Sequence, residues 1–355
     1  LVSLSLAAIL AVPGPASATF EGRNGKIAFS RNGIVLARAD GSGFRRLTSG
    51  QDFGPAFSPK GKEIAFVRGT EPEPDVFKVH IYVMRADGSN VHRVSRGIRG
   101  FGQPPVWSPD GRWIAYGDVI FSDEPQPGPD VDGAAIKIVH PDGSGHQRVT
   151  GYGAFNASPA WSPDSQRIAF VSDRDGDAEI LVMDRKGSNK TQLTSNDVVD
   201  DIPEWSPDGS RIAFTRSIPG PPNQGDEGVA IWTMEPDGND PLQLTDGSRF
   251  DQNPQWSPNG LAIGFTSSTC DAESCIGDLW SMDRTGGSLT NLTEGDDRFV
   301  DYQFAWSPNS TKIAFGLEGD VHTVDTDTLD RSTVSEKPAF EALGDWQAKP
   351  SLTIP

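Results

Sequence analysis

Cysteine, long apolar runs and helical periodicity are all scarce in this sequence, and each shortage excludes a class of protein. Only two cysteines occur among 355 residues, Cys270 and Cys275, and a metal site needs more ligands than this pair. After the first residues no apolar stretch approaches the roughly twenty residues of a membrane-spanning helix. No long segment repeats apolar residues every 3.6 positions, which excludes a helical solenoid.

Basic residues are also in deficit, with 31 Lys and Arg against 49 Asp and Glu and a formal net charge of −18. This balance excludes nucleic acid as the expected partner, because phosphates require clustered Lys and Arg. A basic protein or a divalent cation suits the charge better. The 39 Gly and 28 Pro indicate many turns, and nine Trp with 18 Phe are enough for an apolar core.

A repeat runs through most of the chain. Its anchor is an aromatic residue followed by Ser-Pro, and the aromatic residues are 50, 54, 44, 51 and 50 positions apart. A degenerate copy follows 40 residues after the last anchor, at Asp345-Trp346-Gln347. The six anchors are Phe57-Ser58-Pro59, Trp107-Ser108-Pro109, Trp161-Ser162-Pro163, Trp205-Ser206-Pro207, Trp256-Ser257-Pro258 and Trp306-Ser307-Pro308.

Three more short elements follow each anchor. The first is an Ile-Ala-Phe type triplet, seven residues after the anchor aromatic, as in Ile212-Ala213-Phe214. The next resembles Ile180-Leu181-Val182-Met183, and the last ends in Leu-Thr or a close variant. β-Branched and aromatic residues predict strands, and the Ser-Pro-Asp-Gly and Asp-Gly connections predict tight turns. Four antiparallel strands per 40 to 54 residues is the size of a β-propeller blade.

The count of elements predicts how such a propeller closes. The N-terminal stretch supplies only three strands, Lys26 to Ser30, Ile34 to Ala39 and Phe44 to Thr48, and lacks the innermost one. An orphan strand around Trp346 can fill that place. We therefore expect an all-β, seven-bladed propeller, closed by pairing of the C-terminal strand with the N-terminal blade, with six blades as the second choice. Closure would remove the exposed strand edges of an open ring.

The segment from Trp205 to Phe214 resembles the repeat of the TolB propeller domain, and similar copies cover nearly the whole mature chain. The resemblance implies an extracytoplasmic binding platform. Two differences from the known families limit what this resemblance implies. TolB has an α/β domain before its propeller, whereas here the first blade is expected to begin at Lys26, within ten residues of the expected cleavage site of an export signal. No Gly-x-Ser-x-Gly elbow of a propeller-containing peptidase occurs either.

The first residues predict export from the cytoplasm. Leu1 to Val12 is a short apolar stretch, and Ala16-Ser17-Ala18 has the small residues that a signal peptidase requires. We expect a signal peptide over residues 1–18, cleavage near Ala18, and a propeller domain over residues 19–355. The expected location is periplasmic or secreted, without a membrane span and as a monomer. In that oxidising compartment Cys270 and Cys275 can form a local disulfide, with free thiols as the alternative.

An acidic position recurs five residues before each anchor aromatic. Pseudo-symmetry would place these residues around the mouth of the central channel, where carboxylate oxygens suit calcium. The alternative is that each side chain caps its own loop. The metal candidates are Asn156, Asp200, Asp251 and Asp301, and the expected partner-binding face comprises Asp52, Asp200, Asp251, Asp301 and Glu341; Gly102 stands at the remaining position.

Two functions fit these features. The first is a non-enzymatic scaffold that binds a protein or a cell-envelope component through the acidic, loop-rich face. The second is a calcium- or other metal-dependent hydrolase or lyase with its site at the channel mouth. The five histidines stand near predicted third and fourth strands, and no acid–base or nucleophile–base pair is visible at a shared site. The scaffold is therefore the first expectation.

Overall fold

The computed structural model describes residues 20–73, 76–96, 98–99, 104–121, 131–219, 226–270, 275–295, 300–335 and 342–349. Every regular element in these ranges is a β-strand, so the all-β expectation is confirmed. No helix long and apolar enough to cross a membrane is found within them. The export signal predicted for residues 1–18 and its cleavage site lie outside the described residues.

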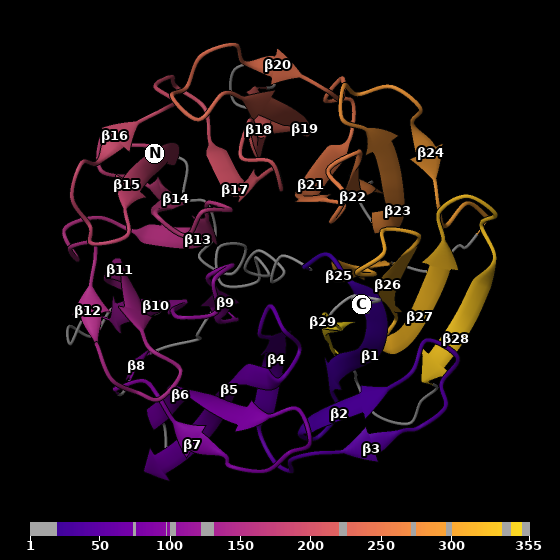
Figure 1. The fold of residues 1–355 in the computed structure, drawn as a ribbon. Coiled ribbons are helices and arrows are strands. Elements are labelled where there is room, and N and C mark those ends of the chain that lie inside the picture. The colour runs from indigo at the N-terminus through magenta and orange to yellow at the C-terminus, as the bar shows by residue number, and fades with distance from the viewer. Residues whose placement is uncertain are drawn as a thin grey trace, which may run out of the picture.

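The strands are arranged as four-stranded antiparallel units around a central axis, and the chain colour runs once around the circle (Figure 1). At two places neighbouring units are joined by hydrogen bonds into larger sheets, of nine and eight strands. This is a propeller arrangement. The first three units contain β29 (Ala342–Lys349), β1 (Arg23–Ser30), β2 (Ile34–Ala37) and β3 (Arg45–Arg46); β4 (Asp52–Phe57), β5 (Glu63–Glu73), β6 (Val76–Arg85) and β7 (His92–Arg93); and β9 (Val106–Trp107), β10 (Ile114–Phe121), β11 (Val131–Val139) and β12 (Gln147–Arg148).

The remaining units repeat this order of strands. They contain β13 (Asn156–Trp161), β14 (Arg167–Ser172), β15 (Glu179–Asp184) and β16 (Thr191–Gln192); β17 (Asp200–Trp205), β18 (Ile212–Pro219), β19 (Asp226–Met234) and β20 (Leu242–Gln243); β21 (Phe250–Trp256), β22 (Ala262–Cys270), β23 (Cys275–Asp283) and β24 (Thr290–Asn291); and β25 (Val300–Trp306), β26 (Lys312–Leu317), β27 (Asp320–Asp325) and β28 (Arg331–Ser335). An additional strand, β8 (Ile98–Arg99), pairs with both β6 and β10.

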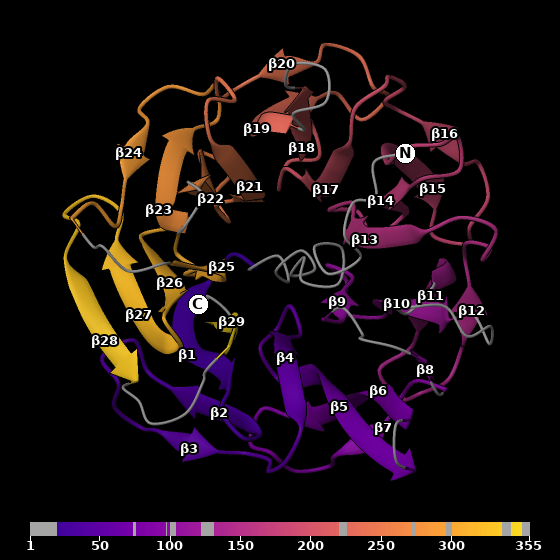
Figure 2. The same ribbon diagram turned by 180° about the vertical axis from the view of Figure 1, so that it is seen from behind.

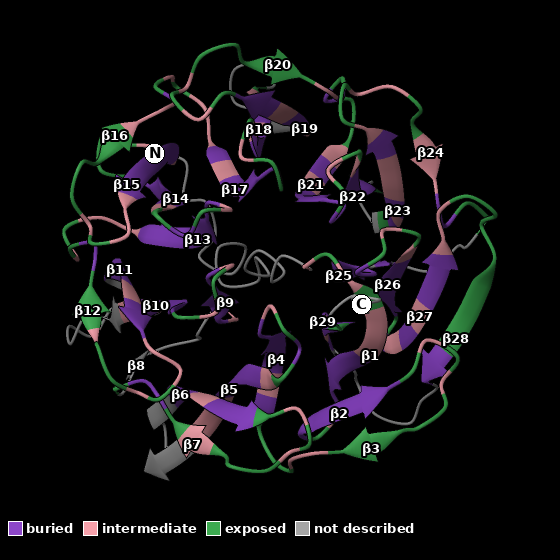
Figure 3. Cartoon of the chain, in the orientation of Figure 1, coloured by how far each residue is buried: buried purple, intermediate pink, exposed green. Residues whose placement is uncertain are grey.

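The apolar core lies between successive units. Strands in the middle of each unit are buried, whereas the outermost strands β3, β12 and β20 are exposed (Figure 3). The anchor aromatics end the innermost strands and are buried. Indole N–H groups of three of them reach back to the preceding unit: Trp107 Nε1 donates to Ala56 O (3.0 Å), Trp161 Nε1 to Val106 O (3.1 Å) and Trp306 Nε1 to Gln255 O (3.1 Å). The aromatic anchor thus joins neighbouring units by packing and by hydrogen bonding.

The recurring Leu-Thr has a structural reason. Its hydroxyl accepts a hydrogen bond from the backbone N–H of the strand-three residue that lies 14 positions earlier, for example Ile180 N to Thr194 Oγ1 at 2.9 Å. The same bond forms in five other units, with serine replacing threonine once. Each short outer strand is therefore tied to its blade by one side chain besides its two ladder pairs.

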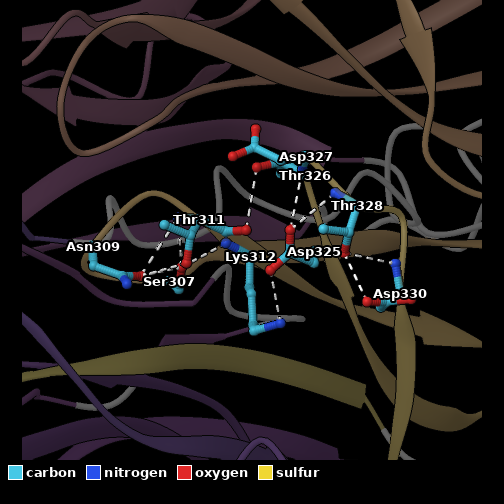
Figure 4. A network of polar contacts seen from close by, with 9 residues as sticks. All are labelled: Ser307, Asn309, Thr311, Lys312, Asp325, Thr326, Asp327, Thr328 and Asp330. Carbon is cyan, nitrogen blue, oxygen red and sulfur yellow. Dashed lines mark hydrogen bonds and ion pairs between the residues drawn. The ribbon is translucent and has the colours of Figure 1, made fainter.

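The Ser-Pro turns are held by their own side chains. In the last unit Ser307 Oγ accepts from Lys312 N (2.8 Å) and donates to Asn309 Oδ1 (2.9 Å), while Lys312 Nζ reaches Asp325 Oδ2 at 3.0 Å (Figure 4). Asp325 Oδ1 in turn accepts the amides of Asp327 and Thr328 in the next hairpin. The serine bond to the residue five positions later recurs in all six Ser-Pro turns. The Ser-Pro motif therefore marks a tight turn that its own serine side chain stabilises.

The two ends of the described chain share one sheet. β29 pairs antiparallel with β1, with Ile27 opposite Trp346 in the register. The two strands lie side by side in both views (Figures 1 and 2). The buried Asp345 carboxylate accepts Phe57 N from the next unit at 2.8 Å, and Gln347 Nε2 donates to Gly61 O at 2.6 Å. The C-terminal strand is thus the innermost strand of the first sheet and also contacts the second.

Candidate functional site

The recurring acidic position begins or nearly begins each innermost strand. Asp52, Asn156, Asp200 and Asp251 are at most 5% exposed. The backbone of Asp301 lies in β25, but its side chain is outside the described part of the chain, as are Gly102 and Glu341. Among the described members no hydrogen bond or ion pair joins one to another. Each instead finds its partners locally, in its own unit or the one before it.

Two of the carboxylates are neutralised by arginine. Asp52 receives Arg68 Nε and Nη2 at 2.6 and 2.7 Å, and Asp200 receives Arg216 Nε and Nη2 at 2.7 Å each. In both pairs the arginine stands opposite the aspartate in the strand register. Asn196 Nδ2 adds a third bond to Asp200 Oδ2 at 2.9 Å. In each pair, two N–H groups of one arginine therefore bind both oxygens of one buried carboxylate.

The same arginines also cover aromatic rings. The Arg68 guanidinium lies 4.6 Å from the ring centre of Tyr82, and that of Arg216 lies 4.8 Å from Trp232. Both rings come from the third strand of the same unit. An aspartate, an arginine and an aromatic ring are thus stacked across three strands, which fixes the arginine from both sides.

The other two described positions use neutral partners. Asn156 Nδ2 donates to the carbonyls of Ala134, Gly151 and Ala154, each at 3.0 Å. Asp251 stands opposite Ser267 in the register. Burial raises the pKa of Asp251, while hydrogen bonds from Ser267 and Thr245 oppose the rise. The alternative expected from the sequence was capping of backbone amides; these bonds of Asn156 and Asp251 are instead with carbonyl oxygens and hydroxyl groups.

A backbone bulge follows the acidic position in four units. The register shifts three residues before the anchor aromatic, where Gly54, Ser158, Ile202 and Asn253 have φ between 51° and 59°. Ile202 is a β-branched residue in the left-handed region, which is a strained conformation. Bulges re-aim side chains and concentrate beside functional sites. Here the bulge separates the acidic end of the strand from its packed aromatic end.

Sequence reasoning missed Glu179, a buried carboxyl group with a raised pKa. It is fully buried at the start of β15, where Asn196 N donates to Oε1 at 2.6 Å and Thr194 Oγ1 contacts Oε2. Burial raises its pKa to about 7, the bonds from Thr194 and Asn196 oppose this, and Asp200 and Asp177 add to it. Glu179, Asn196, Asp200 and Arg216 therefore form one network between two units. Little in the sequence indicated this network, because Glu179 is not at the acidic position that recurs five residues before the anchor aromatics.

Exposed carboxylates lie above this network. Asp175 and Asp197 are exposed, and both raise the pKa of Asp177, for which burial is the larger cause. Asp175 Oδ2 accepts Gln192 Nε2 at 2.5 Å. We name the four residues Asp175, Asp177, Asp197 and Glu179 the acidic cluster. Within the described ranges no group of three or more His, Cys, Asp or Glu side chains is arranged to hold a metal ion.

The raised pKa of Glu179 predicts a pH effect on stability. Because the folded-state pKa of about 7 exceeds the usual 4.5, this group stabilises the fold fully below pH 4.5, and the contribution is lost as pH rises through 7. Glu179→Gln should remove this dependence. In urea denaturation, the stability advantage of the wild type over Glu179→Gln should therefore be smaller at pH 8 than at pH 5. An advantage that grows with pH would contradict the assignment.

Comparison with known proteins agrees with this architecture. The TolB β-propeller domain matches residues 132–327. This chain belongs to the TolB β-propeller domain family. The Tol-Pal system protein TolB of Alcanivorax borkumensis is 38% identical over 94 residues, which are 26% of this chain and 19% of that protein. A TolB homolog of Chlorobium luteolum is 31% identical over 153 residues, or 42% of this chain and 31% of that protein. The alignments thus cover less than a third of each TolB relative.

Solved structures share the TolB-type fold at low sequence identity. TolB from Acinetobacter baumannii has a TM-score of 0.56 and 21% identity, over 82% of this chain and 67% of that one. An oligogalacturonate lyase in complex with manganese has a TM-score of 0.64 and 15% identity, over 94% and 90% of the two chains. At these identities the likeness shows the fold alone.

Proposed function

We propose that this TolB-type propeller is an extracytoplasmic, non-enzymatic scaffold that binds a protein or cell-envelope component through its loop-rich face. Family membership supports a binding role, since one relative is a protein of the Tol-Pal system. The observation that carries the proposal is the acidic cluster. Its exposed members Asp175 and Asp197 concentrate negative charge over a rigid base, which suits a basic partner surface.

We also infer that the four-stranded units form a closed ring of seven blades. The pairing of β29 with β1 supports this count, because it gives the first unit its fourth strand. The bonds from Phe57 N to Asp345 and from Gln347 to Gly61 connect that unit to the next. A closed ring would hold the loops in fixed relative positions, as a multi-loop binding face requires.

Charge reversal should test the binding face without disturbing the buried ion pairs. In capture from the extracytoplasmic fraction of the source cells, Asp175→Lys with Asp197→Lys should lose the partner that the wild type retains. The matched control is Glu235→Lys with Asp327→Lys, two exposed acids in strand three–four hairpins of other units, and it should retain the partner. Equal capture by both variants would reject this face.

The metal-dependent hydrolase or lyase is the second candidate, because oxygen-bearing side chains recur at the acidic position. It would use Asn156, Asp200, Asp251 and Asp301, with calcium or another divalent cation. The arginine bound to Asp200 weighs against this use, because it already neutralises that carboxylate. The scaffold predicts that capture survives chelation by EDTA, and the metal-dependent enzyme predicts stoichiometric metal in protein purified without chelator.

We further propose a disulfide between Cys270 and Cys275 in the mature protein. The two residues stand directly opposite each other in the register of β22 and β23. Opposed residues in antiparallel strands have Cα atoms about 4.5–5.5 Å apart, within the range that a disulfide spans. Peptide mass mapping without reduction should find the two cysteines linked. Alkylation of both thiols in the native, unreduced protein would show that they are free.

A further inference from the structure

A row of cations crosses the first sheet. Its cations include Lys349 from the end of β29, Lys26 from β1, Arg38 just after β2, and Arg45 from β3; β1 also carries Arg23 and β3 also carries Arg46. The register places them toward the same end of the sheet, since Ile27 is opposite Ala37, Leu36 is opposite Arg45, and Lys349 is opposite Arg23, three residues before Lys26. Arg38, Arg45 and Lys349 each lower the pKa of Lys26, after the larger effect of burial. We name these four residues the basic row.

One carboxylate lies near the basic row: hydrogen bonds from Ser42, and then the charge of Arg38, lower the pKa of Asp40. Arg38 Nη1 donates to Ser42 Oγ at 3.2 Å, and Arg45 Nη2 donates to the carbonyl oxygen of Asp87 at 2.9 Å. No ion pair to any of the four residues is found in the part of the chain that the structure describes. The partly buried arginines Arg68 and Arg216, by contrast, each face a buried aspartate. Like charges on adjacent strands destabilise a sheet, so folding stability does not explain this row.

The neighbouring unit extends the positive region. Gln347 bonds Gly61, so the turn that carries Lys60 and Lys62 lies beside the end of β29. Hydrogen bonds from Ser89 lower the pKa of Asp87, and nearby Arg85 and Arg45 lower it further. Residues 20–99 contain 14 Lys and Arg against 8 Asp and Glu, although the whole chain carries −18. The molecule therefore has one basic sector, in its first two units.

We propose that the basic row binds an acidic segment of a partner protein. Neighbouring strands are about 4.8 Å apart, so four cations on four strands form a line roughly 14 Å long. An extended peptide places alternate side chains about 6.8 Å apart, so three alternate carboxylates match this line. Arginine at two of the four positions favours carboxylate recognition through paired N–H donors. A net charge of −18 opposes approach to the broad surface of an anionic bilayer.

The test uses the full chain without its export signal and a fluorescein-labelled peptide of alternating Glu and Thr. Fluorescence anisotropy at low salt should show saturable binding that weakens as salt rises. Arg38→Glu with Arg45→Glu should weaken binding at least tenfold. The matched control reverses two exposed lysines of another unit, Lys186→Glu with Lys190→Glu, and should change affinity less than twofold. Both double variants change the net charge equally.

Other outcomes would overturn the proposal. Equal loss in both double variants would mean that net charge alone governs binding. Binding to phosphatidylglycerol vesicles but not to the peptide would identify a membrane surface instead. If Arg38→Glu with Arg45→Glu lowers the melting temperature, the double variant Arg38→Gln with Arg45→Gln is used in its place. Unchanged affinity of that variant for the peptide would also reject the basic row as the binding site. Asp175→Lys with Asp197→Lys should still bind the peptide, which separates this result from the proposed loop-face function.

Discussion

Removing residues 339–355 should lower the free energy of unfolding by at least about 5 kcal/mol, because it deletes β29 and the buried Trp346. The deletion would also expose the edge of β1, which then becomes available for pairing with another chain. We expect the melting temperature to fall by roughly 10 °C or more and the variant to aggregate. Differential scanning calorimetry and light scattering measure the two effects.

A shorter deletion provides the control. Removing only residues 351–355 leaves all of β29 in place and should change the melting temperature little. Cooperative unfolding of the longer deletion at the wild-type temperature would mean that β29 does not complete the first sheet. It would also remove the support for a closed ring of seven blades.

Arg216→Met should cost about 3 kcal/mol of folding stability, because it leaves the fully buried Asp200 carboxylate with only Asn196 as a side-chain partner. Methionine keeps an unbranched apolar side chain but removes the guanidinium that lies over Trp232. Adding Asp200→Asn should recover part of the loss, since the uncompensated charge disappears. Equilibrium urea denaturation of the single and double variants measures both changes.

Arg211→Met is the matched control, because Arg211 pairs with Asp240 at 2.6 Å but Asp240 is 70% exposed at its side chain. Solvent can replace that ion pair, so the loss should be about 1 kcal/mol or less. Similar losses for Arg216→Met and Arg211→Met would show that burial of Asp200 does not set the effect.

Local repeats carried most of the fold information in this sequence. The aromatic-Ser-Pro anchors predict the innermost strands and their turns because each motif has a local cause, the serine that holds its own turn. The Leu-Thr pairs likewise mark one bond to the third strand. Even the pairing of Trp346 with the first unit followed from counting elements. Interactions between residues close together in the sequence, repeated from unit to unit, could therefore be predicted from the sequence alone.

The candidate site was harder to read because its partners come from other strands. Arg68 and Arg216 each stand 16 residues after their aspartates, a spacing that could have identified both ion pairs. Glu179 and Asp278 each lie 15 residues before a threonine that bonds them, but the raised pKa of Glu179 depends mainly on burial. The basic row could not be predicted from the sequence, because the overall charge is strongly negative and because Lys26 and Lys349 are far apart in the chain.

Engineered cysteines at positions 23 and 349 test the central claim, that the two ends of the chain complete one sheet. Arg23 and Lys349 are directly opposed in the β1–β29 register and both are exposed. Opposed Cα atoms about 4.5–5.5 Å apart permit a disulfide. Arg23→Cys with Lys349→Cys, in a background with Cys270→Ser and Cys275→Ser, should form an intramolecular disulfide in mild oxidant, seen by peptide mapping. Free thiols, or disulfides only between molecules, would contradict the account.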